Sequence, residues 1–177
     1  MKEGLREFLR QTPEAVFAFC GNRNLGHIWK KSIRIPDDQW LFLEGDEFDG
    51  YQTRISQFDI GVAPLRYTKF NTCKSDLRLL EYGAWGVPYV ASDITPYRRF
   101  YEQSNGYGGF LASTPAEWTS RLTYWANNDD PRDGGLLRQH VRQKRGNRAC
   151  GEKWEECLTT IMGLRSRSSE GTTCQAI

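Results

Sequence analysis

Short apolar runs alternate with segments of helical periodicity along most of the chain, and this alternation limits the fold more than any other feature of the sequence. Strands that are joined through helices run parallel, and the helices cover the faces of the sheet that the strands form. The pattern therefore predicts an α/β, doubly wound, Rossmann-like fold with a mostly parallel sheet of about five strands and helices at the C-terminal end.

The predicted strands are short, and most are bounded by glycine, proline or acidic residues. They cover residues 15–20, 40–43, 60–63, 89–91 and 109–111. We expect all five strands in one sheet, with residues 61–63 near its middle.

Helices are easiest to place where their ends carry capping residues. Residues 114–117, Thr-Pro-Ala-Glu, form a capping box with proline at the first helical position, and apolar residues then repeat at helical spacing. Further helical patterns lie before Pro13, at residues 25–31, 51–57 and 76–85, and in two C-terminal segments that begin near Leu136 and end near Gly163. We therefore predict one domain over residues 1–163 and a disordered tail over residues 164–177, which shows no apolar period.

The composition suits a chain that folds without metals or disulfides. Hydrophobic residues make up 38% of the sequence and aromatic residues 13%, which supplies enough large apolar side chains for a core. The 5 cysteines include no C-x-x-C pair and there are only 2 histidines, so we expect free thiols and no zinc site. We expect Cys20 and Cys157 in core positions. The formal net charge of +2 points to no class of partner.

Membrane and export signals are also missing from the sequence. No run approaches the roughly 18 to 20 apolar residues that a transmembrane helix needs. The first six residues, Met-Lys-Glu-Gly-Leu-Arg, lack the apolar stretch of a signal peptide. We therefore expect a cytoplasmic chain with no transmembrane segment.

The loop and helix after the third predicted strand are the most informative place to look for a site, because ligands of open parallel sheets bind beyond the carboxyl ends of the strands. Residues 64–75 form this loop, and the helix over residues 76–85 ends at Gly86. Ser75 is the expected N-cap. The N–H groups at the start of this helix would attract an anion, and Lys74 beside them would add a positive charge for a phosphate.

Glu81 is the second candidate in this segment. It lies inside the same helix, where its carboxylate could accept hydrogen bonds from the two vicinal hydroxyls of a ribose while the phosphates rest on the helix end. Two plainer interpretations stay open: Lys74 as a solvated surface residue, and Glu81 in an ion pair with Arg78, three residues earlier.

A longer pattern surrounds these candidates. It consists of Phe-Asp-Ile-Gly-Val-Ala-Pro-Leu at residues 58–65, Lys-Ser-Asp-Leu at residues 74–77 and Leu-Glu-Tyr-Gly-Ala-Trp-Gly-Val-Pro at residues 80–88. This pattern resembles the donor-binding half of a group 1 (family 4-like) glycosyltransferase of the GT-B fold. The likeness extends more loosely over residues 1–162, through Gly-Gly-Phe-Leu at residues 108–111 and Trp-Glu-Glu at residues 154–156.

The resemblance implies that the chain binds a nucleotide sugar for glycosyl transfer, with a UDP-, GDP- or ADP-linked donor as substrate and neither a metal nor another cofactor. In that family two glutamates separated by seven residues face the donor, and the second of them holds the ribose. Glu81 occupies this second position, whereas Cys73 stands eight residues earlier, where a glutamate is usual. The departure removes one carboxylate from the sugar side of the implied site.

Other positions are implied by the same resemblance. The Asn-x-x-Lys-Ser-Asp run at residues 71–76 is similar to a subgroup in which Lys74 serves the site, with Asn71 and Ser75 beside it. Gly45, after the second predicted strand, would lie close to the nucleotide base. The resemblance leaves the catalytic residues unassigned.

The resemblance covers about half of such an enzyme. The strand that usually opens the donor domain, with its clamp of arginine and lysine for the diphosphate, and the acceptor-binding domain have no counterpart in residues 1–177. We therefore expect the isolated chain to be incomplete for catalysis and to seek an acceptor domain on another polypeptide or a second copy of itself. Basic side chains within residues 138–148 would serve that docking or form a plain solvated face, and we expect no nucleic-acid partner. The alternative function is a noncatalytic binding or assembly module.

Overall fold

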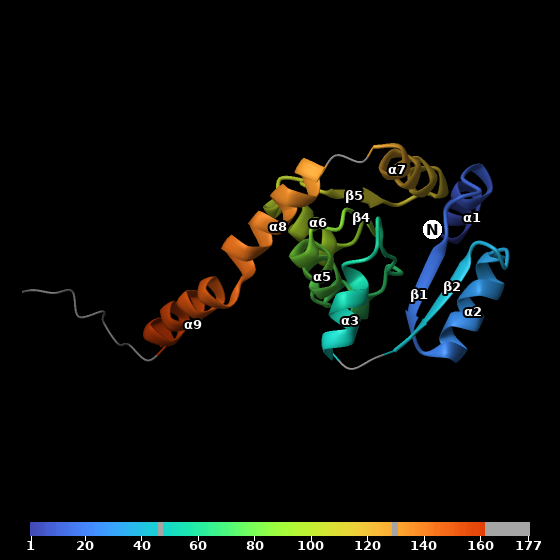
Figure 1. Cartoon of the computed structure of the whole chain (residues 1–177). Coiled ribbons are helices and arrows are strands. Elements are labelled where there is room, and N and C mark those ends of the chain that lie inside the picture. Colours follow the sequence, from blue (N-terminus) through green and yellow to red (C-terminus); the bar gives the residue numbers. More distant parts are fainter. Residues whose placement is uncertain (46–47, 129–130, 162–177) are drawn as a thin grey trace, which may run out of the picture.

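The computed structural model describes residues 1–45, 48–128 and 131–161 and has α/β character, with parallel strands and helices at the C-terminal end (Figure 1). Within these residues the strands are β1 (Phe17–Gly21), β2 (Trp40–Glu44), β3 (Gly61–Ala63), β4 (Tyr89–Ser92) and β5 (Gly109–Ala112). The helices are α1 (Lys2–Gln11), α2 (Arg23–Ile33), α3 (Phe48–Ile55), α4 (Lys69–Thr72), α5 (Leu77–Trp85), α6 (Thr95–Gln103), α7 (Pro115–Asn127), α8 (Pro131–Arg145) and α9 (Asn147–Ile161). Gly163 and the expected tail over residues 164–177 lie outside the described residues.

The strands form two sheets, which corrects the expectation of a single five-stranded sheet. β1 pairs with β2, and β3, β4 and β5 follow one another in that order, every pairing being parallel. Residues 61–63 therefore lie at an edge of the three-stranded sheet and not near the middle of one sheet. The free edge of β3 offers few groups to which β1 could bind. β3 has only 3 residues, and its Val62 carbonyl already accepts a hydrogen bond from the Tyr82 hydroxyl at 3.1 Å.

Alternating side chains give the three-stranded sheet a core on each face. Val90 and Ala112 belong to a cluster that includes residues of α1 and α7. Their neighbours Tyr89 and Ala91 belong to a second cluster, which includes residues of α5, α6 and α8. Because successive side chains of a strand point to opposite faces, the central strand β4 is buried on both sides, as in other parallel sheets covered by helices.

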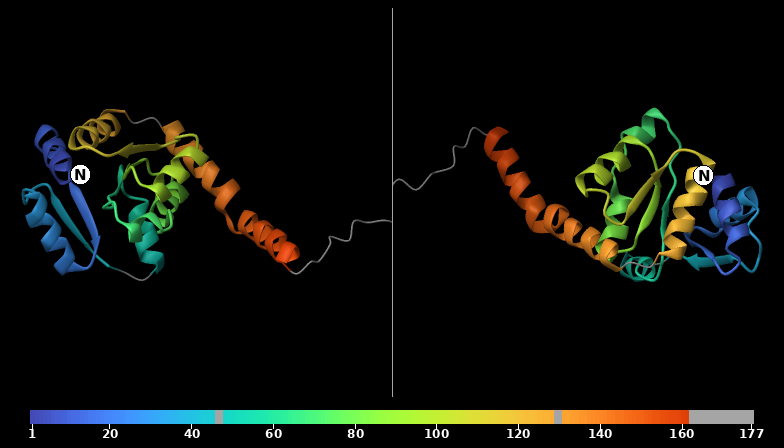
Figure 2. Two further views of the ribbon diagram at one scale, coloured as in Figure 1. Left: turned by 180° about the vertical axis from the view of Figure 1, so that it is seen from behind. Right: turned by 90° about the horizontal axis from the view of Figure 1, so that it is seen from above.

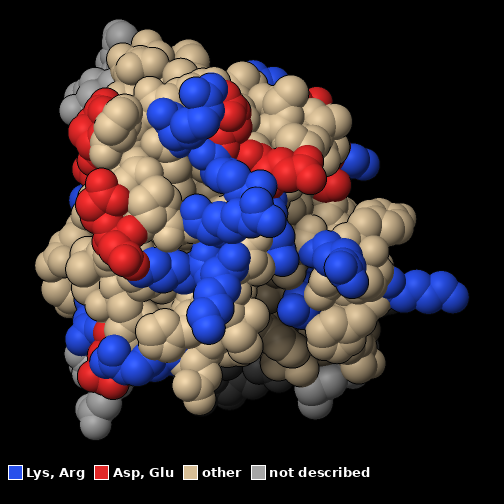
Figure 3. All heavy atoms as spheres, turned by 90° about the vertical axis from the view of Figure 1, so that its right-hand side faces the viewer, with Lys and Arg blue, Asp and Glu red and all other residues tan. Residues whose placement is uncertain are grey.

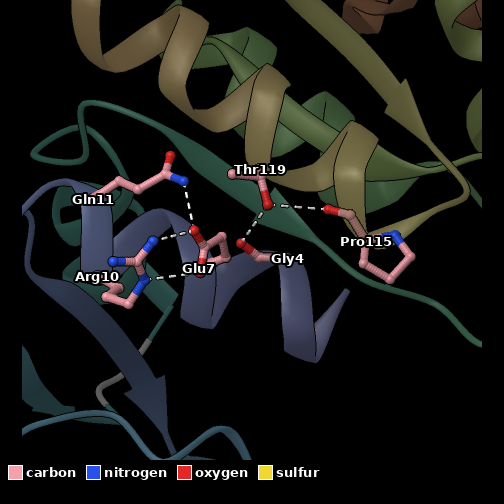
Figure 4. A network of polar contacts seen from close by, with 6 residues as sticks. All are labelled: Gly4, Glu7, Arg10, Gln11, Pro115 and Thr119. Atoms are coloured by element: carbon pink, nitrogen blue, oxygen red, sulfur yellow. Dashed lines mark hydrogen bonds and ion pairs between the residues drawn. The ribbon is translucent and has the colours of Figure 1, made fainter.

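Helices α1 and α7 pack closely against each other and connect the beginning of the chain to its second half (Figure 4). The Thr119 hydroxyl lies within hydrogen-bond distance of the Gly4 carbonyl, at 3.0 Å, and of the Pro115 carbonyl, at 3.1 Å. A Cβ atom at Gly4 would lie 2.3 Å from the Pro115 carbonyl oxygen, so only glycine allows this approach. Within α1, Glu7 accepts hydrogen bonds from Arg10 and Gln11 (Figure 4).

The capping residues placed α7 correctly. The Thr114 hydroxyl accepts a hydrogen bond from the Glu117 N–H, and the Glu117 carboxylate accepts one from the Thr114 N–H in return. The next turns bury Trp118, Leu122 and Trp125, as their spacing predicted. These three side chains fill the core beneath α1.

Helix α9 extends away from the body of the molecule, as the views in Figures 1 and 2 agree. Its apolar residues Trp154, Leu158 and Ile161 are exposed, and no residue of α9 is buried. Cys157 is an exposed free thiol, so the expectation that it occupies the core is wrong, and Cys20 is half-buried. The reason is that, among the described elements, α9 packs to any substantial extent against α8 and against no other element.

Within the described residues, no helix combines the length and the apolar character needed to cross a bilayer.

Candidate functional site

The candidate site lies around α5. The packing of α8 against α5 determines which side chain of α8 lies at the first turn of α5. A Cβ atom at Gly83 would lie 2.6 Å from a methyl carbon of Val141 and 3.3 Å from Leu137, so the absence of a side chain lets the two helices approach closely. The end of α8 then lies beside the start of α5. This arrangement brings Arg145 to the N-terminal end of the predicted anion-binding helix.

Asp76, and not Ser75, is the N-cap of α5, which corrects the sequence prediction. The Asp76 side chain makes no capping hydrogen bond and instead accepts two from Arg145, at 2.7 and 2.9 Å. Asp76 is buried, and the side chain of Arg145 is 25% exposed. The Asp76 carboxylate raises the pKa of the Arg145 guanidinium. Ser75 is exposed.

This ion pair changes the chemistry of the helix end. An aspartate at an N-cap normally accepts a hydrogen bond from the helix and places a negative charge there. Here Arg145 turns the Asp76 carboxylate away and balances its charge. The N–H groups of Leu77 and Arg78 have no hydrogen-bond acceptor among the described residues, so the first turn of α5 remains able to bind an anion.

The loop before α5 carries the next two candidates. Lys74 is exposed, and its ammonium lies 5.1 Å from the centre of the Phe70 ring. Asn71 lies in the short helix α4, and its side-chain amide donates a hydrogen bond to the Arg66 carbonyl at 2.7 Å. Asn71 therefore supports the loop, while Lys74 stays accessible. Tyr67 and Phe70 are the most exposed aromatic side chains of this loop, at 79% and 75%.

Glu81 lies on α5 with its side chain only 13% exposed. One of its carboxylate oxygens, Oε2, accepts a hydrogen bond from the Tyr51 hydroxyl at 3.2 Å and lies 2.9 Å from the Arg78 guanidinium. The structure thus contains the ion pair that was the plainer interpretation of Glu81. Burial raises the pKa of the Glu81 carboxyl, and the Arg78 charge opposes this effect. The second oxygen, Oε1, is engaged by no hydrogen bond from the described residues.

Helix α3 connects Glu81 to the strand end at Gly45. Tyr51 of α3 contacts Glu81, and Arg54, one turn further, donates a hydrogen bond to the Glu44 carbonyl. Gly45 is exposed, and its N–H donates to the Gly21 carbonyl at 3.3 Å, where β1 and β2 both end. One face of α3 therefore lies between Gly45 and Glu81.

Four of the five predicted site residues lie on one segment of the structure, and the fifth, Gly45, lies on another. Asn71, Lys74, Ser75 and Glu81 follow one another through α4 and the first turns of α5, whereas Gly45 is linked to them through α3. The sequence reasoning missed Tyr51, and it assigned Arg145 to a docking surface, whereas Arg145 pairs with Asp76 at the start of α5. Nothing in the sequence signals either contact, because the contacts span 30 and 69 residues.

A second charged surface competes as an anion site, on the face formed by α1 and α2 (Figure 3). Lysine and arginine gather there, but acidic side chains border them. Lys30 pairs with Asp37, Arg10 with Glu7 at 2.6 Å, and Arg23 with Glu44 at 3.6 Å. These pairs balance the charges of three of its basic side chains, which weakens the attraction of this surface for an anion.

No family model and no curated protein sequence matches the chain. Among the described residues, no three His, Cys, Asp or Glu side chains lie together in a way that could hold a metal ion.

Proposed function

We propose that the chain binds a nucleotide sugar as the donor-binding half of a glycosyltransferase. The observation that carries the proposal is the combination of an open first turn of α5, an accessible Lys74 just before this helix and a nearly buried carboxylate at Glu81 within it. The resemblance of residues 58–88 to donor-binding domains supports the same assignment. The acceptor domain of this proposal is a second polypeptide or a second copy of the chain.

Each group has a distinct role in the proposed complex. The diphosphate rests on the N–H groups of Leu77 and Arg78 and is neutralised by Lys74. Glu81 lies four residues into the helix, which is about 6 Å along its axis, and accepts hydrogen bonds from the ribose hydroxyls. Its free oxygen Oε1 can accept a first hydroxyl without breaking the contacts of Oε2. Asn71 and Ser75 border the phosphates, and Gly45 borders the base.

Replacing Glu81 by alanine is expected to weaken the binding free energy of the nucleotide sugar, UDP-glucose or GDP-mannose, by about 1 to 3 kcal/mol. The reason is that the variant loses a charged hydrogen-bond acceptor for the ribose hydroxyls. Isothermal titration calorimetry measures the affinity. Glu102→Ala, at an exposed position of α6, is the matched control and should leave the affinity unchanged. Equal affinities of the Glu81→Ala variant and the parent chain would refute the ribose role.

Replacing Lys74 by alanine is expected to weaken the nucleoside diphosphate by about tenfold or more and the nucleoside hardly at all, since the ammonium acts on phosphate. The comparison uses UDP against uridine, or GDP against guanosine. Lys69→Ala on α4 is the control for a general loss of positive charge. If Lys74→Ala weakened the nucleoside as much as its diphosphate, the phosphate role would be wrong.

A noncatalytic assembly module is the second candidate function. The observation that favours it is the exposed apolar row of Trp154, Leu158 and Ile161 on α9, a helix that leaves the body of the molecule. Under this alternative, neither nucleotide nor nucleotide sugar binds. Sedimentation of the chain with and without Trp154→Ser would then show an association that depends on α9.

A further inference from the structure

We propose that α9 is a dimerisation helix, which pairs with α9 of a second copy of the chain in antiparallel orientation. The pairing is independent of nucleotide binding and is compatible with either candidate function. It rests on the exposure of α9, on the spacing and sizes of its apolar side chains, and on the placement of its charges.

α9 presents an apolar face that the described residues leave uncovered. The helix extends away from the body of the molecule and, among the described elements, packs substantially against α8 alone (Figures 1 and 2). Trp154 is 67% exposed and Ile161 74%. Because large apolar side chains on one face of a helix are unfavourable in water, a second surface that covers this face would bind it favourably.

The spacing of the exposed side chains is that of a helix in a two-stranded coiled coil. Four of them follow one another at intervals of 4, 3 and 4 residues, and we call these four the seam: Cys150, Trp154, Cys157 and Ile161. This spacing lets a helix pack along its whole length against another helix. All four seam residues are exposed, and both cysteines are free thiols.

The sizes of the seam residues fit a second copy in reversed orientation, because small and large side chains alternate along the helix. With a two-fold axis between residues 155 and 156, Trp154 of one copy lies opposite Cys157 of the other, and Cys150 lies opposite Ile161. Every layer of the contact then combines one small and one large side chain, which fills the space between the helices evenly. A parallel pair would instead place Trp154 against Trp154 in one layer and cysteine against cysteine in the next, which packs unevenly.

The neighbours of the seam fit the same arrangement. Leu158, which is 48% exposed, borders the seam and in the antiparallel pair would lie near Gly151 of the other copy. A Cβ atom at Gly151 would meet no atom within 4 Å, so this position is open to the leucine side chain. On the other border, Lys153 would lie near Thr160 of the other copy and meet no like charge.

The remaining charges of α9 stand away from the seam. By helical spacing they lie on the opposite face of the helix, at Arg148, Glu152, Glu155 and Glu156. Arg148 and Glu152 pair with each other at 3.1 Å. The proposed contact therefore buries apolar side chains without taking a charge out of water.

The contact is short, which limits its strength. α9 has 15 residues and is about 22 Å long, or two heptads. Such a contact is smaller than the roughly 800 Å² per partner that stable complexes bury, so we expect a transient dimer and a largely monomeric chain in dilute solution. An experiment that traps the contact covalently detects such a dimer.

The test uses disulfide formation between two single-cysteine variants. One variant keeps Cys150 and has alanine at the other cysteine positions, and the second has alanine at all 5 cysteine positions together with Ile161→Cys. The two are mixed in equal amounts at high concentration and oxidised with glutathione disulfide. The antiparallel pair places the two different cysteines in one layer, whereas identical ones stay about 16 Å apart along the axis. We expect the mixed dimer to form at least about tenfold faster than either homodimer.

Two further substitutions, each made in both variants, check that the seam is responsible. Trp154→Ser should slow the mixed dimer to the rate of the homodimers, and Glu155→Ser, on the opposite face, should leave its rate unchanged. Homodimers that form as fast as the mixed dimer would mean random collision, and homodimers that form faster would mean a parallel pair. Either result, or a mixed dimer that forms equally fast with Trp154→Ser, would overturn the proposal.

Discussion

Replacing Trp118 by alanine is expected to lower the free energy of unfolding by about 3 to 5 kcal/mol, the largest effect of any single substitution considered. Trp118 is 1% exposed and lies in the cluster shared by α1, α7 and both sheets. Its removal leaves a cavity between elements that are far apart in the sequence. Urea denaturation followed by circular dichroism measures the loss.

Trp154 provides a matched control for this substitution. It is also a helical tryptophan, but its exposure is 67% and it belongs to α9, which contributes nothing to either core. Trp154→Ala should change the free energy of unfolding by no more than about 0.5 kcal/mol. Similar losses for the two variants would mean that α9 packs in solution in a way that the structure does not have.

Replacing Arg145 by methionine is expected to cost about 2 to 4 kcal/mol, because it leaves the buried Asp76 carboxylate without its two hydrogen bonds. The range is below that of a fully buried pair, since a quarter of the Arg145 side chain is exposed. Denaturation in urea again provides the measurement. The double variant Arg145→Met with Asp76→Ala should recover most of the loss.

The control for this second prediction lies on the same helix. Arg142 is exposed on α8, three residues before Arg145, and Arg142→Met removes the same charge without touching Asp76. It should be close to neutral. A loss at Arg142 equal to that at Arg145, or a double variant no more stable than Arg145→Met, would show that the ion pair is not what holds α8 against the start of α5.

Local patterns predicted the elements of this fold well. The strands expected at residues 40–43 and 89–91 correspond to β2 and β4 within one residue, because continuous apolar runs closed by turn residues leave little choice of structure. α7 followed from its capping box for the same local reason. α6 was missed, because the mean hydropathy of its 9 residues is low and its N-cap residue, Ile94, makes no side-chain cap.

Local sequence patterns could not predict which strands pair with each other, because that pairing involves residues far apart in the sequence. The division into two sheets depends on whether β1 and β3 meet, and nothing in either run of residues determines that. The cap of α5 shows the same limit. Ser75 and Asp76 are both favourable N-cap residues, and the choice depends on Arg145, 69 residues away. Cys157 and its apolar neighbours on α9 had helical spacing without a partner to pack against, so spacing predicted the helix but not its burial.

The most direct measurement of the central proposal is a titration of the isotope-labelled chain with UDP-glucose and with GDP-mannose, followed through amide chemical shifts. Binding of a nucleotide sugar to α5 predicts saturable shifts for one of the two donors, concentrated at residues 71–81 and reaching Gly45. The Glu81→Ala variant should lose them, while Glu102→Ala retains them. Saturation with either donor that leaves residues 71–81 unshifted, or no saturable shift with either donor up to millimolar concentration, would contradict the proposed nucleotide-sugar site.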